Sequence, residues 1–141
     1  MVYSTDMDRL AFPLIVVDWN AVEPVYVQIA RQVRAQIASG QLPAGMNLPS
    51  VRTMASDLGV NLNTVARAYR ILEEEGFVVI RDRAGAVVAP PGQVTDESTI
   101  AGLAGELGSV LARMRQAGLS IEELWRRVET ELAGLAAGGH K

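Results

Sequence analysis

The segment NLNTVARAYRILEEEG, residues 61–76, decides which fold the sequence predicts. Four of its apolar residues follow the i, i+3, i+4, i+7 spacing of a single helix face: Val65, Ala68, Tyr69 and Leu72. The opposite face carries polar side chains that can form hydrogen bonds: Asn63, Thr64, Arg67 and Arg70. The pattern predicts an amphipathic helix whose wet face is either ordinary solvated surface or a surface for recognition.

Two further helices are expected before this segment. Residues 24–40, PVYVQIARQVRAQIASG, begin with proline and end with glycine, which are favoured in the first turn and just past the end of a helix. Residues 50–59, SVRTMASDLG, begin with Ser50 as an N-cap and stop at Gly59. With Asn63 as the expected N-cap of the next helix, a tight turn joins the second and third helices, as in a helix-turn-helix motif.

Short β-branched runs predict strands on both sides of these helices. Residues 12–19, FPLIVVDW, are expected to form a first strand. Residues 77–80, FVVI, and 86–89, AVVA, flank the charged, glycine-containing stretch 81–85, which predicts a hairpin with a basic tip. Residues 41–49 contain two prolines and a glycine and are expected to form turns.

The C-terminal part is expected to be helical again. One apolar stripe runs from Ile100 to Met114 and ends at Gly118, and Ser120 with Glu123 has the spacing of a capping box that opens a second helix. The order of elements predicts an α+β fold, mainly α, in which a winged helix-turn-helix domain precedes two helices. The expected divisions are a flexible N-terminus (1–11), the winged domain (12–90), a linker (91–98), a helical dimerisation and possible effector region (99–136) and a tail (137–141).

Composition argues against several classes of function. The chain of 141 residues has no Cys, and its single His is His140, next to the C-terminus. Disulfides, thiolate catalysis and cysteine zinc sites are excluded, and no convincing Ser-His-Asp triad can be assembled. We therefore expect no catalytic residues, no metal and no cofactor. No apolar run approaches membrane-spanning length and no signal peptide is recognisable, so we expect a soluble, cytoplasmic protein without a membrane partner.

The net charge of −3 would by itself disfavour a polyanionic partner, but the charge is unevenly distributed. Residues 24–90 carry seven Arg against five acidic residues, whereas residues 1–23 and 91–141 are both acidic. This basic middle permits DNA as a partner.

Three pieces of the basic middle carry a family resemblance: GQLPAG, LPSVR and NTVARAYRILEEEG. Residues 24–90 resemble, without a gap, the DNA-binding domain of the GntR family of bacterial transcription regulators. The short two-helix C-terminal region resembles the YtrA subfamily, which lacks a large effector domain. The resemblance implies a homodimer that binds a double-stranded operator, more often as a repressor.

The resemblance also implies which residues approach the DNA. It places Arg52 at the start of the second helix, Asn63, Thr64 and Arg67 on the recognition helix, and Tyr26 where relatives contact a phosphate. Arg81, Arg83 and Gly85 fall in the wing, which enters the minor groove in relatives. The candidate DNA-binding residues are Tyr26, Ser50, Arg52, Asn61, Asn63, Thr64, Arg67, Arg70, Arg81, Arg83 and Gly85.

Several positions depart from the pattern of the family. Leu62 and Ala66 stand where many members have Arg, Val51 replaces a frequent Glu, and Asp82 stands where many YtrA-like members are basic. The DNA site must therefore differ from the sites of the Arg-rich members.

Two candidate residues have a competing structural interpretation. Tyr26 is equally well explained by burial in the first helix. Arg70 could reach a phosphate, but an ion pair with Glu73 or Glu74 is slightly favoured. The acidic run 73–75 would repel DNA and is expected to point into solvent.

The two C-terminal helices are expected to form the dimer. The candidate dimerisation residues are Leu103, Leu107, Val110, Leu111, Met114, Leu124, Trp125, Val128 and Leu132. Trp125 is favoured as an interface anchor over the wall of a small-molecule pocket. The glycines at 102, 105 and 108 have two compatible interpretations: they permit a second helix to approach closely, and they weaken the helix.

The sequence thus predicts a DNA-binding transcription regulator, with a possible small-molecule effector acting through the C-terminal helices. The alternative is a winged-helix module that binds a protein partner without sequence-specific DNA binding. An enzyme is a distant third hypothesis, because the chain has no room for the large catalytic domain that some relatives carry.

Overall fold

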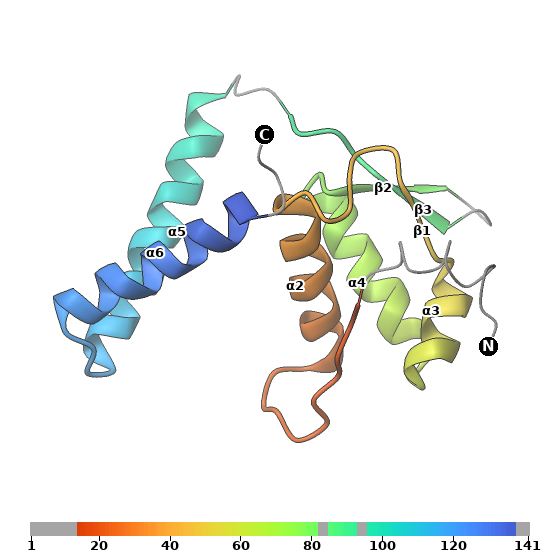
Figure 1. Ribbon diagram of the computed structural model, residues 1–141, viewed down its shortest axis with the longest axis horizontal. Helices are drawn as coiled ribbons and strands as arrows, with labels where there is room; N and C mark the ends of the chain where they lie inside the picture. Colours follow the sequence, from red (N-terminus) through yellow and green to blue (C-terminus); the bar gives the residue numbers. More distant parts are fainter. Residues whose placement is uncertain (1–13, 82–84, 93–95, 138–141) are drawn as a thin grey trace. The chain divides into compact units, whose positions relative to one another are not determined.

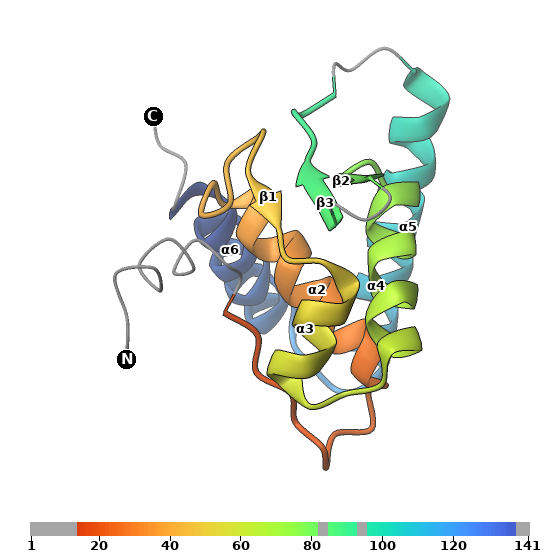
Figure 2. The same cartoon turned by 90° about the vertical axis from the view of Figure 1, so that its right-hand side faces the viewer.

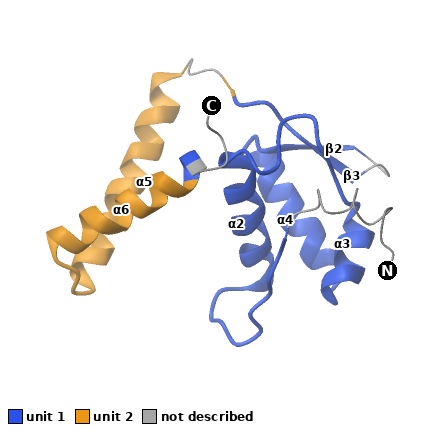
Figure 3. Cartoon of the chain, in the orientation of Figure 1, with its two compact units in different colours: residues 1–91, 135–141 blue, residues 92–134 orange. Residues whose placement is uncertain are grey.

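The computed structural model describes residues 14–81, 85–92 and 96–137, and its helices and the β2–β3 hairpin follow the expected order (Figure 1). The described helices and strands are α2 (Val25–Ala38), β1 (Asn47–Leu48), α3 (Val51–Leu58), α4 (Leu62–Glu74), β2 (Val78–Arg81), β3 (Gly85–Val88), α5 (Glu97–Gln116) and α6 (Ile121–Ala137). The chain divides into two units, residues 1–91 with 135–141 and residues 92–134 (Figure 3). The expected flexible N-terminus, 1–11, lies outside the described residues, as do residues 138–141 of the expected tail and 93–95 of the expected linker.

The core of the first unit is built from the facing sides of α2, α3 and α4, with the small sheet beside them (Figure 2). The apolar stripe expected on α4 is confirmed, because Val65, Ala68, Tyr69 and Leu72 are all 0% exposed. Burial of large apolar side chains contributes roughly 1.5–3 kcal/mol each, so this stripe fixes which face of α4 remains in water.

Tyr69 places a polar group inside this core and gives it a partner. Its hydroxyl donates a 2.7 Å hydrogen bond to the backbone carbonyl of Pro49, just ahead of α3. Burial raises the pKa of the Tyr69 hydroxyl above its usual value of 10, because the phenolate would lose its hydration. The bond ties the middle of α4 to the residue before the N-cap of α3.

The sheet has three antiparallel strands in the order β1-β3-β2. The expected hairpin is confirmed, with Val79 opposite Val87 and Arg81 opposite Gly85. Its third strand is β1, inside the stretch 41–49 that was expected to form only turns. The two prolines and the glycine of that stretch lie outside the two residues that pair with β3, so they do not prevent a short strand.

The strand expected at 12–19 is wrong for residues 14–19, which lie in no sheet. Glutamine side chains of α2, and not a neighbouring strand, form the hydrogen bonds to the backbone of this segment. Gln36 both accepts from Leu14 N–H and donates to Leu14 C=O, at 3.3 and 3.0 Å. Gln32 does the same for Val16, at 2.9 and 2.8 Å, and Gln28 for Asp18, at 2.8 and 3.0 Å.

This arrangement explains why the sequence pattern was misleading. Three glutamines four residues apart share one side of α2, and each offers an amide that mimics a strand's backbone. An extended segment with alternating burial can therefore be satisfied without a strand neighbour. Ile15 is half-buried against the core, whereas Leu14 and Val16 are exposed.

The second unit is a helical hairpin of α5 and α6. The capping box is confirmed: Ser120 N–H donates to Glu123 Oε1 at 2.9 Å, and Glu123 N–H donates to Ser120 Oγ at 3.1 Å. The first of these bonds, from the Ser120 backbone N–H, is the largest cause that lowers the pKa of the Glu123 carboxyl. No residue of α5 is buried, so its apolar stripe has little cover within the described chain.

No helix in the described part of the chain combines the length and the apolar character that crossing a bilayer requires.

Gly85 should be intolerant of substitution. Its φ is +88°, and an added Cβ would lie 3.0 Å from Leu48 O and 3.1 Å from Ser50 Cα. Gly76 has the same φ, +88°, but open space around an added Cβ, so it is a matched control. We expect Gly76→Ala to lower the free energy of unfolding by about 1–2 kcal/mol and Gly85→Ala by about 2–4 kcal/mol, measured by denaturant titration. Equal losses would show that the contact with β1 is unimportant.

Tyr69→Phe should lower the free energy of unfolding by about 1–3 kcal/mol at neutral pH, because the buried Pro49 carbonyl loses its donor. The raised pKa of Tyr69 adds a pH dependence: this stabilisation is complete below the unfolded pKa of 10 and is lost as pH rises above it. The difference between wild type and Tyr69→Phe should therefore shrink in alkaline solution. A difference that stays constant above pH 10 would contradict the burial of this hydroxyl.

Candidate nucleic-acid interface

A three-residue turn joins α3 to α4 and holds the two helices together. Gly59 has φ +69°, the left-handed conformation that ends α3, and its N–H donates to Ser56 O. Val60 N–H donates to Ala55 O at 3.0 Å, which folds the turn back onto α3. This geometry is that of a helix-turn-helix, in which the first helix braces the second.

Asn61, and not the predicted Asn63, is the N-cap of α4. Its Oδ1 accepts from the Asn63 N–H at 2.7 Å, so the helix starts at Leu62. Sequence reasoning missed this because both residues are good caps two positions apart. One oxygen of Asn61 is thus engaged by its own helix, whereas the Asn63 side chain lies exposed on the first turn.

Arg67 projects from the exposed face of α4, and its guanidinium is stacked on an aromatic ring. The Arg67 Cζ lies 3.8 Å from the centroid of the Tyr26 ring, which comes from the first turn of α2. The Tyr26 side chain is half-buried, so it is neither fully inside the core nor fully exposed to solvent. Thr64, one turn before Ala68 on the side of α4, is also half-buried.

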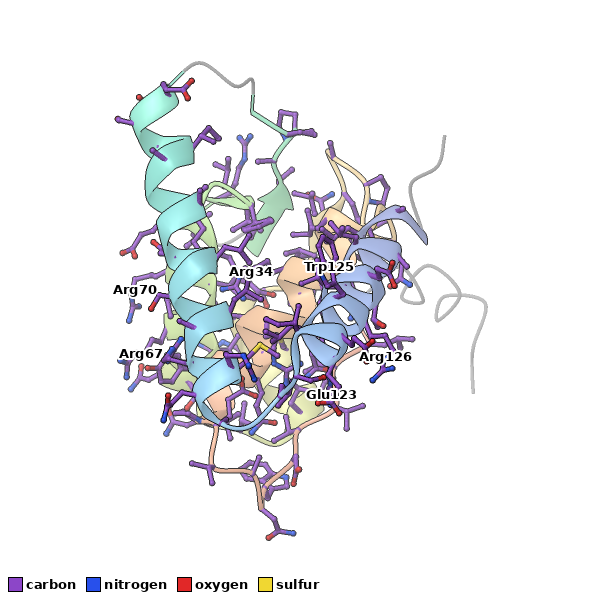
Figure 4. The ribbon with its side chains drawn as sticks, turned by 90° about the vertical axis from the view of Figure 1, so that its left-hand side faces the viewer. Arg34, Arg67, Arg70, Glu123, Trp125 and Arg126 are labelled. Atoms are coloured by element: carbon purple, nitrogen blue, oxygen red, sulfur yellow. The ribbon has the colours of Figure 1, made fainter. Side chains whose placement is uncertain are left out.

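Arg70 lies one turn beyond Arg67 on the same side of α4 (Figure 4). The ion pair slightly favoured for it is not formed: the ion pairs among the described residues are Glu23–Arg31 and Glu75–Arg34. The neighbouring carboxylates are engaged elsewhere. Glu73 Oε2 accepts from the Ile80 N–H at 3.0 Å, and Glu75 accepts two bonds from Arg34, at 2.9 and 3.1 Å. The exposed Arg70 guanidinium is therefore available to an anionic partner.

The acidic run 73–75 is exposed, as expected, but two of its members also have structural partners. Glu73 ties the last turns of α4 to β2 of the wing, and Glu75 ties the end of α4 to α2. Sequence reasoning missed both contacts, because a run of three carboxylates gives no signal of which backbone or guanidinium each will meet.

Ser50 and Arg52 lie at the start of α3. Ser50 Oγ accepts from the Thr53 N–H at 3.0 Å and donates to Thr53 Oγ1 at 3.0 Å, so its expected capping role is confirmed. Arg52 is exposed in the first turn of the same helix. Ser50 is therefore committed to the helix, and Arg52 is the residue of this motif that can reach outward.

Only part of the wing is described. Arg81 is exposed at the end of β2, and Gly85 is buried at the start of β3. The candidate Arg83 and the departure at Asp82 lie outside the described residues. The geometry gives Gly85 a packing role against Leu48 and Ser50, which is separate from any contact with a ligand.

The expected dimerisation residues lie on the α5–α6 hairpin. Leu103, Leu107, Val110, Trp125 and Leu132 are exposed, Leu111, Met114 and Val128 are half-buried, and Leu124 is 9% exposed. An apolar groove of about 520 Å³ lies between the two helices and is lined by residues that include Leu107, Leu111 and Trp125. Figure 4 shows Trp125 on the α5 side of α6 and Arg126 pointing away. An added Cβ at Gly102, Gly105 or Gly108 would meet nothing within 4 Å in the described chain.

The described residues hold no group of acidic or histidine side chains arranged as a metal site.

Comparison with known proteins is consistent with this geometry. The model of the family "Bacterial regulatory proteins, gntR family" matches residues 25–88. The uncharacterized HTH-type transcriptional regulator YhcF of Bacillus subtilis is 33% identical over 116 residues, which cover 82% of this chain and 96% of the relative. The HTH-type transcriptional regulator Rv1152 of Mycobacterium tuberculosis is 45% identical over 73 residues, which span 52% of this chain but only 60% of that regulator.

A solved structure extends the similarity beyond the DNA-binding domain model. YtrA from Sulfolobus acidocaldarius, a GntR-family transcription factor, superposes with a TM-score of 0.59 at 36% identity. The superposition covers 72% of this chain and 97% of that one. The winged helix-turn-helix fold and the resemblance to YtrA, both inferred from the sequence, are confirmed.

The guanidinium of Arg70 is exposed and forms no ion pair among the described residues, which predicts a phosphate contact. Arg70→Ala should weaken binding to all duplexes uniformly and reduce the slope of log K against log salt by about 0.9, the value for one lost phosphate contact. Arg126→Ala, which removes an exposed guanidinium from α6, is the control and should leave the slope unchanged. A change of base preference in Arg70→Ala would contradict a pure phosphate role.

Proposed function

The chain belongs to the GntR family of bacterial regulatory proteins, and we propose that it is a sequence-specific DNA-binding transcription regulator that acts as a homodimeric repressor. One observation carries this proposal: α4 has one face that is 0% exposed at four positions and an opposite face that carries Asn63, Arg67 and Arg70. A helix anchored in this way presents a fixed set of donors to a groove.

In the proposed complex, some residues contact the DNA bases and others contact the DNA phosphates. Asn63 and Arg67 lie in the first half of α4, the part of a recognition helix that reaches base edges in the major groove. Asn pairs well with adenine and Arg with guanine. Arg52, Arg70 and Arg81 surround this centre with positive charge and fit phosphate contacts, which fix the position of the protein on the duplex.

Leu62 gives the proposed operator a further feature. It stands where many relatives have Arg, and its side chain is 42% exposed on the first turn of α4. An apolar side chain in the major groove favours the methyl group of thymine over a hydrogen-bonding edge. The proposed operator therefore contains a thymine where Arg-bearing relatives would favour guanine.

The proposed dimer is formed by the α5–α6 hairpin. Its apolar side chains are too exposed for a helical pair in water: Leu103 is 55%, Leu107 56% and Leu132 59% exposed. Exposed large apolar side chains gathered on one helical pair mark an interaction site, and a second copy fits it because a twofold axis then pairs the recognition helices on a pseudo-palindrome. Half-sites would lie about one helical turn apart.

The groove between α5 and α6 supports a second, compatible role. Its volume of about 520 Å³ lies within the range of small-molecule sites, roughly 300–1,000 Å³, and its lining is almost entirely apolar. An apolar effector bound beside Trp125 would alter the packing of the hairpin. It would thereby change the spacing between the two recognition helices of the dimer. Coupling of this kind is typically about 1–3 kcal/mol.

Neither competing class is favoured by the described residues. The relatives with which the chain aligns are transcription regulators and not enzymes. A purely protein-binding winged helix would not require the cluster of exposed guanidiniums around α4.

Selection of bound duplexes from a random DNA pool tests the proposed regulator. We expect a consensus with two related half-sites, bound at least about a thousandfold more tightly than random DNA at physiological salt. Binding that depends on salt but not on sequence would contradict the proposal. The absence of DNA binding even at low salt would favour the protein-interaction module.

Leu107→Glu should convert the dimer to a monomer, because it places a charge in the apolar groove. Ser109→Glu is the matched control: the same charge is introduced on the same helix, two residues away and therefore on the opposite face. Light scattering should report a monomer for Leu107→Glu and a dimer for Ser109→Glu, with helical content unchanged in both. Deletion of residues 99–141 should likewise leave a folded monomer. A truncated protein that remains dimeric would contradict the role of the hairpin.

A further inference from the structure

The stack of Arg67 on Tyr26 is the closest contact between a guanidinium and an aromatic ring in the described structure. The 3.8 Å separation of the Arg67 Cζ from the ring centroid is well inside the range of about 6 Å in which such pairs attract. The other such pair, Arg34 over Phe77, is at 5.9 Å, near that limit. At this distance the guanidinium carbon of Arg67 is in van der Waals contact with the face of the Tyr26 ring.

The position of the Tyr26 ring is fixed by the packing of α2. Ile29 and Val33, one and two turns further along this helix, are 0% exposed in the core. The start of α2 is held by Gln28, which is 2% exposed and donates to both Asp18 O and Glu23 O, at 3.0 and 2.8 Å. The ring therefore belongs to a rigid part of the first unit.

The packing of α2 against α4 fixes the position of Arg67, the other member of the stacked pair. At the far end of α4, Glu75 forms a two-bond ion pair with Arg34 of α2. The core residues between these ends include Val65 and Ala68, both 0% exposed. The ring and the guanidinium accordingly meet in a geometry set by the fold, whereas Arg70, one turn along α4, has no ring against it in the described structure.

We propose that Tyr26 is a positioning residue for base recognition, whose ring, and not its hydroxyl, holds the Arg67 guanidinium in the orientation that pairs with a base edge. The inference rests on the proposed DNA-binding function. A free Arg side chain samples many rotamers, and the stack removes part of this conformational freedom before DNA arrives. With one face covered by the ring, the N–H edge of Arg67 remains to pair bidentately with guanine O6 and N7.

This role differs from two others that the same residue could have. A hydroxyl that contacts a phosphate would make binding sensitive to Tyr26→Phe and would leave base preference intact. A purely packing role would make the effect of a Tyr26 variant independent of Arg67. Positioning by the ring predicts the opposite in both cases.

The binding experiment uses the full-length protein and a duplex that wild type selects from a random pool, together with versions of it in which each G·C pair is replaced. Tyr26→Phe should bind within about twofold of wild type, since the face of the ring is kept. Tyr26→Leu should bind about three- to tenfold more weakly and lose discrimination at the same base pair as Arg67→Ala. In the Arg67→Ala background, Tyr26→Leu should have no further effect beyond about twofold.

A measurement without DNA tests the stack by itself. In the free protein, the ring current of Tyr26 should shift the Nε–Hε resonance of Arg67 upfield in wild type and in Tyr26→Phe. The shift should vanish in Tyr26→Leu. An unshifted resonance in wild type would overturn the inference before any DNA is added.

The outcomes separate this inference from the proposed function. If wild type selects no consensus, the proposed function fails and the inference fails with it. If wild type selects a consensus and Tyr26→Leu keeps its discrimination, only the inference fails. Equal losses in Tyr26→Phe and Tyr26→Leu would assign the role to the hydroxyl, and an equal loss of affinity from Tyr26→Leu with and without Arg67 would assign it to packing; either result overturns the inference.

Discussion

Tyr69 lies at 0% exposure in the middle of α4, and its hydroxyl donates to the Pro49 carbonyl just before α3. This contact fixes the rotation of the recognition helix about its own axis. A rotation of α4 would expose the Tyr69 ring and leave the buried Pro49 carbonyl without a hydrogen-bond donor. The three-residue turn from Gly59 to Asn61 then sets the angle between α3 and α4. The exposed face that bears Asn63, Arg67 and Arg70 is therefore a consequence of what α4 buries.

Residues at the margins of the buried face of α4 also form contacts with neighbouring elements. Glu73 accepts from the backbone of β2 on one side, and Glu75 and Arg67 meet residues of α2 on the other. Because these contacts join the helix to the wing and to α2, the surfaces proposed to meet bases and phosphates form one rigid unit. Such preorganisation lowers the conformational cost of binding, which is otherwise a large part of the free energy of association. The α5–α6 hairpin, by contrast, exposes large apolar side chains such as Leu103 and Leu107.

Sequence reasoning recovered the features that periodicity encodes. The buried stripe of α4, the hairpin, Ser50 as the N-cap of α3 and the capping box of Ser120 and Glu123 each follow from local spacing, and each is present in the structure. The GntR-like motifs predict the winged helix, and the structure confirms it. The assignments of the individual DNA-contacting residues remain proposals.

The errors of sequence reasoning arise where the partner of a group is distant in the chain. Residues 12–19 have the pattern of a strand, but glutamines 10 to 22 residues away bond the backbone of Leu14, Val16 and Asp18. β1 has two residues, too few for a periodic signal, and only β3 reveals it. Arg70 has carboxylates at the right helical spacing, yet Glu73 binds a backbone amide of the wing. The local sequence pattern cannot decide between alternative partners for the same group, because the choice depends on tertiary contacts.

Mapping of the backbone amides that change on DNA binding tests the central claim most directly. A heteronuclear spectrum of the labelled full-length protein, titrated with its selected duplex, should show the largest shifts at residues 61–67 of α4, then at Ser50–Arg52 and Arg81. A scrambled duplex of the same length should give small shifts that vanish at high salt. Large, sequence-dependent shifts confined to residues 14–18 and the glutamine side of α2, with α4 unchanged, would contradict the account.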